Sequence, residues 1–417
     1  MKKKSVHIIG GGIIGLCTAW YLNKEGYQVT VVDKNDFTGG TSYGNAGVIV
    51  PSHFVPMATP GIITQGLKWL LDSKSPFYVK PRFSLDLAQW LWHFNRSATP
   101  KKANAAMPVL YDINHKSKKL YQEIVAEVNF DFNYQERGLL MLYKTKKQAD
   151  KEAKVAERAH QLGIPVEILD NEGLKKLDPS MDLNVLGGVY YPSDAHLYPN
   201  QLMKGLISVL KEKGVQFLSN TSITDFGIRN ASIEALITSK NTKIQVEQVA
   251  LTAGSWTGIL LKKAGIKMHI QDGKGYSVTI KNPKNRPQIP AILTEAKVTV
   301  TPMGEDLRIG GTLELSGFSP KISKRRVQGI LESVPKYYNN LTIPSIETEK
   351  VWKGYRPCTP DGLPYIGRTE NVSNLIVGTG HGMMGLSLGA ITGKLLCQII
   401  SNQKPMTTIH PFRFNRF

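Results

Sequence analysis

Cysteine is nearly absent from this chain, with three residues among 417, at positions 17, 358 and 397. Their wide spacing forms no CxxC pair, which excludes a disulfide framework and a thiolate metal site and is typical of a reducing cytoplasm. Long hydrophobic runs are also missing, since no stretch approaches the roughly 18 to 20 apolar residues of a membrane-spanning helix. We therefore expect a cytoplasmic globular protein without a bound metal.

Acidic residues are outnumbered, because 33 Asp and Glu face 52 Lys and Arg, which leaves a formal net charge of +19. Such an excess favours nucleic acid, an anionic membrane surface or an anionic substrate as a partner. The basic residues are spread along the chain, with clusters at residues 2–4 and 321–326, and no nucleic-acid-binding motif accompanies them. A peripheral contact with the inner membrane is therefore favoured over nucleic acid. A solvated basic surface without any partner explains the charge equally well.

Glycine, by contrast, is concentrated near the N-terminus. Residues 6–9 form an apolar run typical of a buried parallel strand, and Gly10, Gly12 and Gly15 follow it in GxGxxG spacing before an apolar-periodic helix over residues 14–23. A second apolar run ends in Asp33. This order predicts a β-α-β unit of the Rossmann type that binds a dinucleotide. A purely structural glycine turn and a signal peptide are the alternatives, and the missing small-residue cleavage site argues against the second.

Each of these residues has a physical role in such a unit. Gly10 permits a tight turn, Gly12 leaves no Cβ between the backbone and a pyrophosphate, and Gly15 lets the helix pack closely. The N–H groups and positive dipole at the helix N-terminus attract phosphate. Asp33 would accept hydrogen bonds from a ribose hydroxyl.

The segment from residue 38 to 60 is too long and too polar for a simple turn, and such loops are usually functional. Thr41 and Ser42 offer hydroxyls to phosphate, and residues 44–47 would let the backbone lie against a flat ring. Farther along, an apolar run over residues 246–252 leads into Ala253 and Gly254. We expect that turn to lie near the cofactor as well.

The remaining pattern predicts an α/β protein of two discontinuous domains. Helices are expected at residues 62–71, 84–95, 104–128, 146–162, 201–214, 319–337 and 384–400. Strands are expected at residues 138–143, 187–191, 215–218, 268–280, 291–301, 307–313, 349–355 and 375–377. Successive strands without intervening helices favour an antiparallel arrangement. Residues 1–60, 196–265 and 350–417 would form a Rossmann-type parallel-sheet domain, and residues 61–195 and 266–349 a substrate domain on a mixed, largely antiparallel sheet.

Three stretches carry a resemblance to a known family. They are GGGIIGLCTAWYLNKEGYQVTVVDK (10–34), TSYGNAGVIVP (41–51) and WKGYRPCTPDGLPYIGRTENVSNLIVGTGHGMMG (352–385). Together they resemble the D-amino-acid oxidase superfamily of flavoproteins, and in particular its bacterial D-amino acid dehydrogenases. The resemblance implies FAD as the cofactor and the oxidation of a substrate α-amine to an imine, which water hydrolyses to a keto acid.

The same resemblance implies which residues bind FAD. They are Gly10, Gly12, Ile13, Ile14, Gly15, Asp33, Lys34, Thr41, Ser42, Asn45, Ala46, Gly47, Val48, Ala253, Gly254, Gly354, Arg356, Gly380, His381, Gly382, Met383, Met384 and Gly385. The last helix, expected over residues 384–400, would point its N-terminus at the pyrimidine end of the flavin. That dipole favours the negative charge of reduced flavin.

Arg356 is the residue that the resemblance implies for the substrate carboxylate, since a guanidinium binds a carboxylate bidentately and lysine cannot. A structural arginine is the alternative. Tyr276 would line the same pocket. His53 stands where the dehydrogenases carry tyrosine, so a cyclic imino acid such as proline or hydroxyproline joins D-amino acids as an expected substrate. His53 and His196 are acid or base candidates, although hydride transfer from a neutral amine needs no strong base.

The electron acceptor is left open by the sequence. A dehydrogenase would pass electrons to a quinone or another carrier, whereas an oxidase of the glycine or sarcosine type would use oxygen. A non-catalytic flavin-binding protein is a third interpretation. The motif around Arg356 argues against it, as does the lack of a second GxGxxG for a nicotinamide cofactor.

Overall fold

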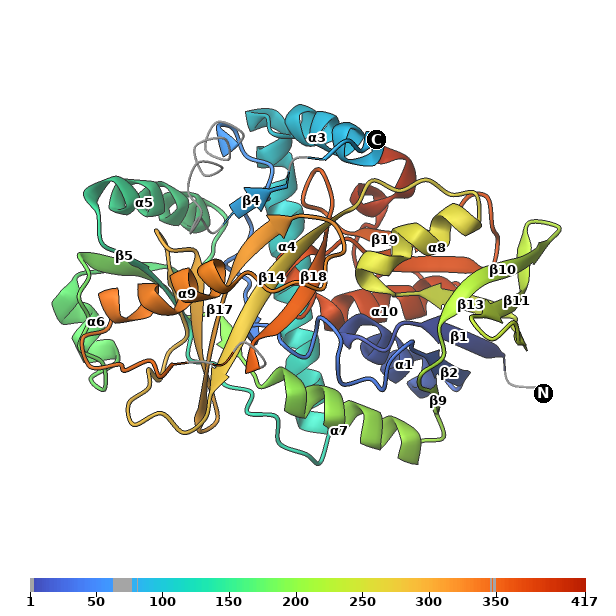
Figure 1. Ribbon diagram of the computed structural model, residues 1–417, viewed down its shortest axis with the longest axis horizontal. Helices are drawn as coiled ribbons and strands as arrows, with labels where there is room; N and C mark the ends of the chain where they lie inside the picture. Colours follow the sequence, from blue (N-terminus) through green and yellow to red (C-terminus); the bar gives the residue numbers. More distant parts are fainter. Residues whose placement is uncertain (1–3, 63–76, 81, 346, 348–349) are drawn as a thin grey trace.

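The computed structural model describes residues 4–62, 77–80, 82–345, 347 and 350–417. Two sheets lie side by side with helices around them (Figure 1). The helix expected at residues 62–71 falls, except for Ile62, outside the described residues.

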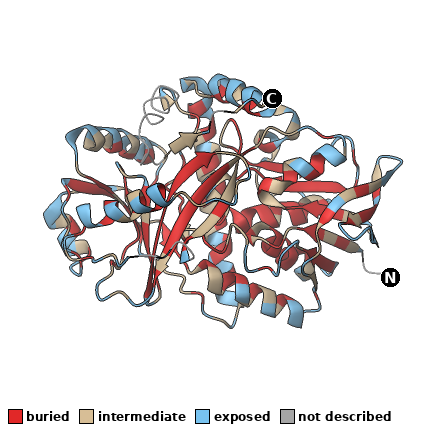
Figure 2. Cartoon of the chain, in the orientation of Figure 1, coloured by how far each residue is buried: buried red, intermediate tan, exposed pale blue. Residues whose placement is uncertain are grey.

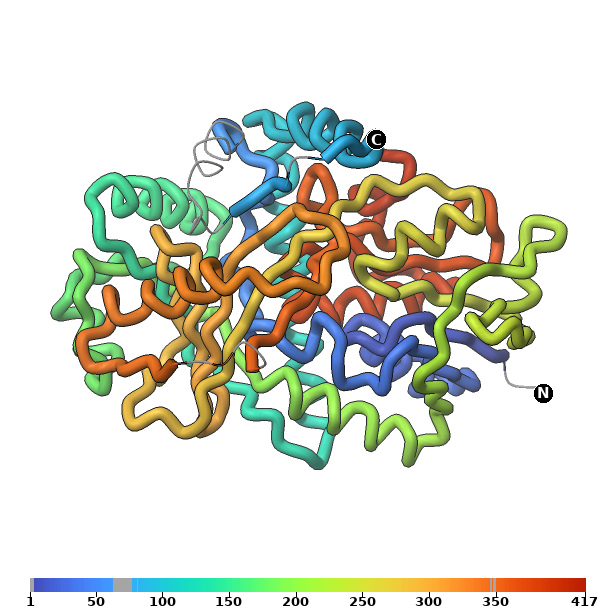
Figure 3. The backbone as a smooth tube through the Cα atoms, viewed as in Figure 1, coloured from blue at the N-terminus to red at the C-terminus, as the bar shows by residue number. Residues whose placement is uncertain are grey.

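The first sheet, called here the parallel sheet, contains six strands in the described part of the chain, in the order β19-β20-β13-β1-β2-β9. Their bounds are Tyr365–Arg368, Leu375–Thr379, Gln248–Leu251, Ser5–Ile9, Gln28–Val32 and Gln216–Leu218. Each neighbouring pair is parallel except β19 and β20. β1 thus lies between β2, the next strand of the chain, and β13, which comes from a distant part of the sequence (Figure 3).

Alternating side chains of the parallel sheet enter two different cores. Val6 and Ile8 of β1 pack with α1 (Ile13–Lys24), α7 (Pro199–Glu212) and α10 (Gly389–Ile400). Ile9 instead packs with α8 (Thr257–Lys263) and with a small sheet of β10 (Ile223–Arg229), β11 (Ser232–Thr238) and β12 (Lys243–Gln245). Both faces are therefore buried, as is typical of parallel sheets.

The second sheet, called here the mixed sheet, has nine strands within the described residues. Eight follow the order β18-β14-β17-β16-β15-β5-β7-β6, with bounds Trp352–Cys358, Gln271–Ile280, Asp306–Leu315, Val298–Met303, Ala291–Leu293, Leu139–Tyr143, Gly187–Tyr191 and Glu167–Leu169. The ninth, β4 (Phe77–Val79), runs parallel to β17, and β15 runs parallel to β5. All other pairs are antiparallel. The predicted fold class is confirmed, and the domain boundaries stay a prediction.

Several elements differ from the sequence-based expectation. The small sheet β10–β12 was missed, and the strand expected at 291–301 is two strands joined by a turn. The basic helix expected at 319–337 is α9 (Lys324–Ser333) followed by a short 3-10 turn, because Pro320 precedes it. The last helix begins at Gly389 and not at residue 384. The other helices are α3 (Leu85–Ser97), α4 (Pro100–Glu127), α5 (Lys146–Gln161) and α6 (Asn171–Leu177).

Buried residues follow both sheets, and the outer helix faces are exposed (Figure 2). Trp90 of α3 is buried, and its indole N–H donates to the Cys358 carbonyl at 2.9 Å, whereas Trp92 is 53% exposed. All three cysteines are free and buried. In the residues that the structure describes, no group of side chains fits a metal ion, and no helix is long and apolar enough to cross a membrane.

Candidate active site

One large cavity lies between the two sheets, with a volume of about 960 Å³. This volume lies within the range typical of sites that bind whole cofactors. At one end it is lined by the turn between β1 and α1, and at the other by β16, β17 and β18 of the mixed sheet. We call these the cofactor end and the substrate end. Residues 44–46, Val48 and residues 381–387 line the stretch between them.

The three motif glycines divide into two kinds. A Cβ on Gly10, whose φ is +104°, would lie 2.6 Å from the Thr252 carbonyl oxygen, and one on Gly15 would lie 2.0 Å from the Gly10 oxygen. These two glycines therefore hold the turn tightly against its neighbours. A Cβ on Gly12 would meet only the Ser42 hydroxyl, at 3.3 Å, and Gly12 lines the cavity. Gly12 thus leaves free backbone facing the space that a pyrophosphate needs.

The N-terminus of α1 is held by neighbouring polar groups. Gly12 is the N-cap residue and supplies no capping side chain; instead the Ser42 hydroxyl accepts from the Ile13 N–H at 3.0 Å. The carboxylate of Asp33 accepts from the Gly11 N–H at 2.8 Å. Thr41 donates to the Tyr355 carbonyl. The Thr41 and Ser42 hydroxyls, which were expected to face phosphate, thus form hydrogen bonds within the protein. Both residues still line the cavity.

These observations test whether a flavin dinucleotide fits. The cofactor end combines a side-chain-free glycine, a helix N-terminus and a carboxylate just after β2, and all three lie on one cavity wall. This donor set matches the pyrophosphate and ribose of FAD. The residues present therefore fit the cofactor.

Most of the residues predicted to bind FAD line the cavity, and three do not, namely Gly15, Gly47 and Gly380. Gly47 and Gly380 have φ near +80° and are packed on protein, with hypothetical Cβ atoms 2.4 Å from the Leu197 oxygen and 2.6 Å from Thr359 Cγ2. They shape buried turns. Gly44 lines the cavity, and a Cβ on it would lie 1.9 Å from the Trp352 indole, so this position has no room for a side chain; its contact with a flavin ring stays a prediction.

The segment after β20 also corrects the prediction. A three-residue 3-10 turn, Gly382–Met384, lines the cavity, and α10 begins five residues later. The helix therefore begins five residues later than expected, and the orientation of its N-terminus toward the flavin stays a prediction. His381 is buried, and its Nε2 lies 2.8 Å from the Thr392 hydroxyl. Burial lowers the pKa of His381 to about 3, so the ring is neutral.

Arg356 lies on β18 at the substrate end. Its guanidinium crosses over Gly275 of β14, where a Cβ would lie 2.4 Å away, and Nη1 donates to the Thr312 carbonyl of β17. Burial lowers the pKa of Arg356. No carboxylate lies within 4 Å of it in the part of the chain that the structure describes. Since buried charges are normally paired, this guanidinium lacks an anion that a ligand can supply.

Thr312 was not anticipated from the sequence. Its φ of +69° is unusual for a β-branched residue and coincides with a β-bulge between β14 and β17. At this point the neighbour of β17 changes from β16 to β4. The bulge directs the Thr312 carbonyl at Arg356.

The other predicted side chains divide between the cavity and the core. Tyr276 lines the cavity and accepts from the Ser323 N–H at 3.2 Å, while burial raises its pKa. His53 lines it as well, with Nδ1 at 3.2 Å from the Ser52 hydroxyl. His196 pairs with Val48 and is not among the lining residues. Burial lowers the pKa of both histidines to about 4, so both rings are neutral at neutral pH.

A buried carboxyl supports the His53 segment. Asp194 accepts from the Ser52 hydroxyl at 2.5 Å and from the Ser52 N–H at 3.0 Å. Burial raises the pKa of Asp194 to about 7. The contact joins the loop after β7 to the segment that lines the middle of the cavity.

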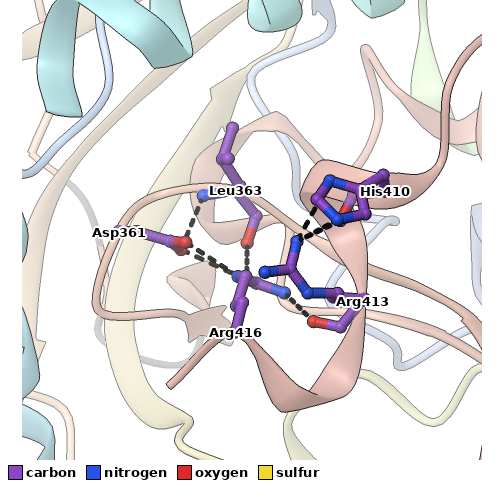
Figure 4. Close-up of polar contacts among 5 residues, drawn as sticks. All are labelled: Asp361, Leu363, His410, Arg413 and Arg416. Carbon is purple, nitrogen blue, oxygen red and sulfur yellow. Dashed lines mark hydrogen bonds and ion pairs between the residues drawn. The ribbon is translucent and has the colours of Figure 1, made fainter.

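The loop after β18 is fixed by the end of the chain (Figure 4). Arg416 pairs with Asp361 at 2.7 Å, donates to the Leu363 carbonyl and lies 3.9 Å from the centre of the Tyr365 ring. The Arg416 side chain, through its pairing with Asp361, thereby restrains the loop that follows β18.

Sequence reasoning did not name several other lining residues, among them Trp256 and Lys297. Trp256 lies 3.2 Å from the Lys34 ammonium at the cofactor end, and Lys297 lines the substrate end. Neither belongs to a motif, and both reach the cavity through strand pairings that a local pattern does not encode.

Comparison with known proteins gives one consistent result. Residues 5–399 match the family described as FAD dependent oxidoreductase. A D-amino acid dehydrogenase of Helicobacter pylori is 32% identical over 399 residues, covering 95% of each chain, and one of Granulibacter bethesdensis is 32% identical over 414 residues, covering 96% of each. The glycine oxidase structure from Geobacillus kaustophilus has a TM-score of 0.75 at 21% identity, with both chains fully covered.

Proposed function

Because the chain belongs to the family of FAD dependent oxidoreductases, we propose that it oxidatively deaminates an amino or imino acid whose carboxylate is held by Arg356. The observation that carries this proposal is the half-buried guanidinium, which faces the cavity without an ion-pair partner among the described residues. A bidentate, charge-assisted contact supplies both affinity and orientation. The substrate class follows the relatives named D-amino acid dehydrogenase.

The roles of the two cavity ends follow from their residues. Gly10, Gly12 and Asp33 would hold the dinucleotide, with residues 1–60, 196–265 and 350–417 as the proposed cofactor domain. Residues 61–195 and 266–349 would form the substrate domain. FAD, when bound, supplies the two-electron oxidation. The protein orients the substrate through Arg356 and excludes water with apolar walls such as Met141 and Phe94.

Proton transfer at the substrate end does not rely on a strong base. Asp33 is the one carboxylate among the described lining residues, and it lies at the cofactor end. His53 is neutral and a weak base, since burial lowers its pKa to about 4. We therefore propose that the substrate reacts as the neutral amine, with His53 and Tyr276 lining the pocket.

Electrons would leave to a quinone or another carrier at the cytoplasmic face of the membrane. The net charge of +19 supports an electrostatic contact with anionic lipid. Of the predicted basic cluster, Lys321, Lys324 and Arg325 are exposed, whereas Arg326 is buried and pairs with Glu314 at 3.2 Å. Salt-sensitive co-sedimentation with anionic vesicles and slow reaction with oxygen are expected. Rapid peroxide formation without vesicle binding would favour the oxidase.

The decisive experiment is anaerobic reduction of the purified holoenzyme. A panel of D- and L-amino acids, proline and hydroxyproline is mixed with the protein, and bleaching of the flavin absorbance is followed. At least one amino or imino acid should bleach the flavin. If none does, while dithionite reduces it fully, the proposed function is wrong.

A further inference from the structure

A second cation lines the substrate end of the cavity, on the turn between β15 and β16. Lys297 directly precedes β16, and Thr299 and Ile292 beside it also line the cavity. Lys297 has a φ of +54°. Lysine is uncommon in this left-handed conformation, where glycine or asparagine is favoured. Strain of this kind gathers at functional sites, which makes the position a candidate for one.

The ammonium of Lys297 lacks a close counter-ion. Lys297 is exposed by surface area, yet partial desolvation lowers its pKa. Both observations agree with a side chain that lines a cavity open to solvent. No described carboxylate lies within 4 Å of it.

The two carboxylates that act on Lys297 electrostatically are occupied elsewhere. Glu152 accepts from Gln148 at 2.8 Å, and burial raises its pKa, which disfavours its charged form. Glu295 accepts from the N–H groups of Lys144 and Thr145 and from the Tyr337 hydroxyl. Neither one neutralises Lys297 at close range.

Lys297 and Arg356 approach the same short stretch of β17. The Lys297 carbonyl oxygen lies 3.2 Å from the Cβ position of Gly311, and Arg356 donates to the carbonyl of the next residue, Thr312. Adjacent strands are about 4.8 Å apart, so the backbone of Lys297 lies on the order of one strand spacing from the carbonyl that holds the guanidinium. Four cationic residues line the cavity, against a single carboxylate, Asp33, among its described lining residues.

Resting on the proposed function, we propose that Lys297 binds a second carboxylate, so that the preferred substrates are acidic amino acids with the chemistry of aspartate or glutamate. Arg356 holds the α-carboxylate and Lys297 the side-chain carboxylate. The cations thereby fix the substrate at two points. A neutral isostere of the side chain leaves Lys297 without a counter-ion in the complex.

The test compares each acid with its isosteric amide in the FAD-loaded enzyme. The kcat/KM ratios of D-glutamate to D-glutamine and of D-aspartate to D-asparagine are measured, with the L-enantiomers in parallel. A charge-assisted contact predicts that the wild-type protein favours the acid by about 10-fold to 100-fold. In Lys297→Met the ratio should fall to about 1, and in Lys297→Glu it should invert. Kinetics with D-alanine and FAD content should hardly change.

Lys151→Met is the matched control. Lys151 is exposed on α5 and acts on the same Glu152 and Lys297, yet it does not line the cavity. The control should keep the acid-to-amide ratio of the wild-type protein. Competitive inhibition by glutarate against butyrate gives a second readout without turnover, and its preference for glutarate should vanish in Lys297→Met alone.

The outcomes separate the two proposals. If neutral amino acids bleach the flavin but the acids react no better than their amides, the proposal for Lys297 is wrong and the proposed function stands. An equal loss for all substrates in Lys297→Met would show a structural role and also overturn it. If imino acids alone bleach the flavin, only the proposal for Lys297 is wrong. If no amino or imino acid bleaches it, both proposals fail.

Discussion

The cofactor end and the substrate end of the cavity are built in different ways. The cofactor end is made largely of backbone from one short stretch, where glycines touch their neighbours at distances that exclude a side chain. The substrate end is made of side chains from β16, β17 and β18, which are far apart in the sequence. The cofactor end requires positions without a side chain, whereas the substrate end requires particular side chains. Substitutions at the two ends should therefore impair the protein in different ways.

Gly15→Val should have the largest effect and would break the cofactor end alone. The new side chain meets the Gly10 oxygen, which lies 2.0 Å from the Cβ position, so α1 must move away from β1. Overpacking of this kind costs about 1 to 3 kcal/mol or more. Thermal unfolding and the flavin absorbance of the purified protein measure the outcome, and both a lower Tm and loss of FAD are expected.

Gly258→Ala in α8 is the control for that change. No described atom lies within 4 Å of its Cβ position, and alanine is favoured over glycine within a helix. It should keep its FAD and a Tm equal to or above that of the wild-type protein. Full FAD occupancy in Gly15→Val would contradict the role given to this turn.

Arg356→Ala and Arg356→Lys should break the substrate end and leave the fold intact. A bidentate, charge-assisted contact contributes on the order of 2 to 4 kcal/mol, so KM should rise roughly 30-fold to 1000-fold. Lysine cannot restore both bonds. Steady-state kinetics and flavin content provide the measurements, with exposed Arg229→Lys on β10 as the control. Unchanged kinetics in either Arg356 variant would place the carboxylate elsewhere.

Asp194→Asn should have the smallest effect and acts between the two ends. Burial raises the pKa of this carboxyl from its ordinary 3.8 to about 7, so the folded state binds the proton more tightly than the unfolded state. Its contribution to stability is therefore complete below pH 4 and is lost as the pH rises through about 7. In Asp194→Asn this loss is absent. The free energy of unfolding of the variant, relative to that of the wild-type protein, should therefore be higher at pH 8 than at pH 5.

Denaturant unfolding at several pH values measures that difference. Comparing the variant with the wild-type protein at each pH isolates Asp194 from His53 and His196, which titrate in both proteins. Asp150→Asn, at an exposed position of α5, serves as the control and should show no such pH dependence. A constant difference between Asp194→Asn and the wild-type protein would contradict the shifted pKa.

The same contrast explains what the sequence could predict. The fold class and the β-α-β unit with Asp33 follow from local patterns, since GxGxxG and strand periodicity act within a few residues. At the substrate end, Arg356 and Tyr276 were named through the family resemblance, whereas Thr312 and Lys297 were not, because these two reach the cavity only through the pairing of β14, β16 and β17. The start of α10 was also misplaced, because an apolar run does not distinguish a 3-10 turn from the first turn of a helix.

The three buried thiols allow the surroundings of the two ends of the cavity to be compared without any substitution. Cys17 and Cys397 lie where α1 meets α10, and Cys358 ends β18, two residues after Arg356. Burial raises their pKa values to about 12, 11 and 12, which suppresses the reactive thiolate in the native protein. A thiol reagent can therefore label each cysteine only when its surroundings open. Labelling rates read by mass spectrometry would report the opening of each sheet separately, with native residues as the probes.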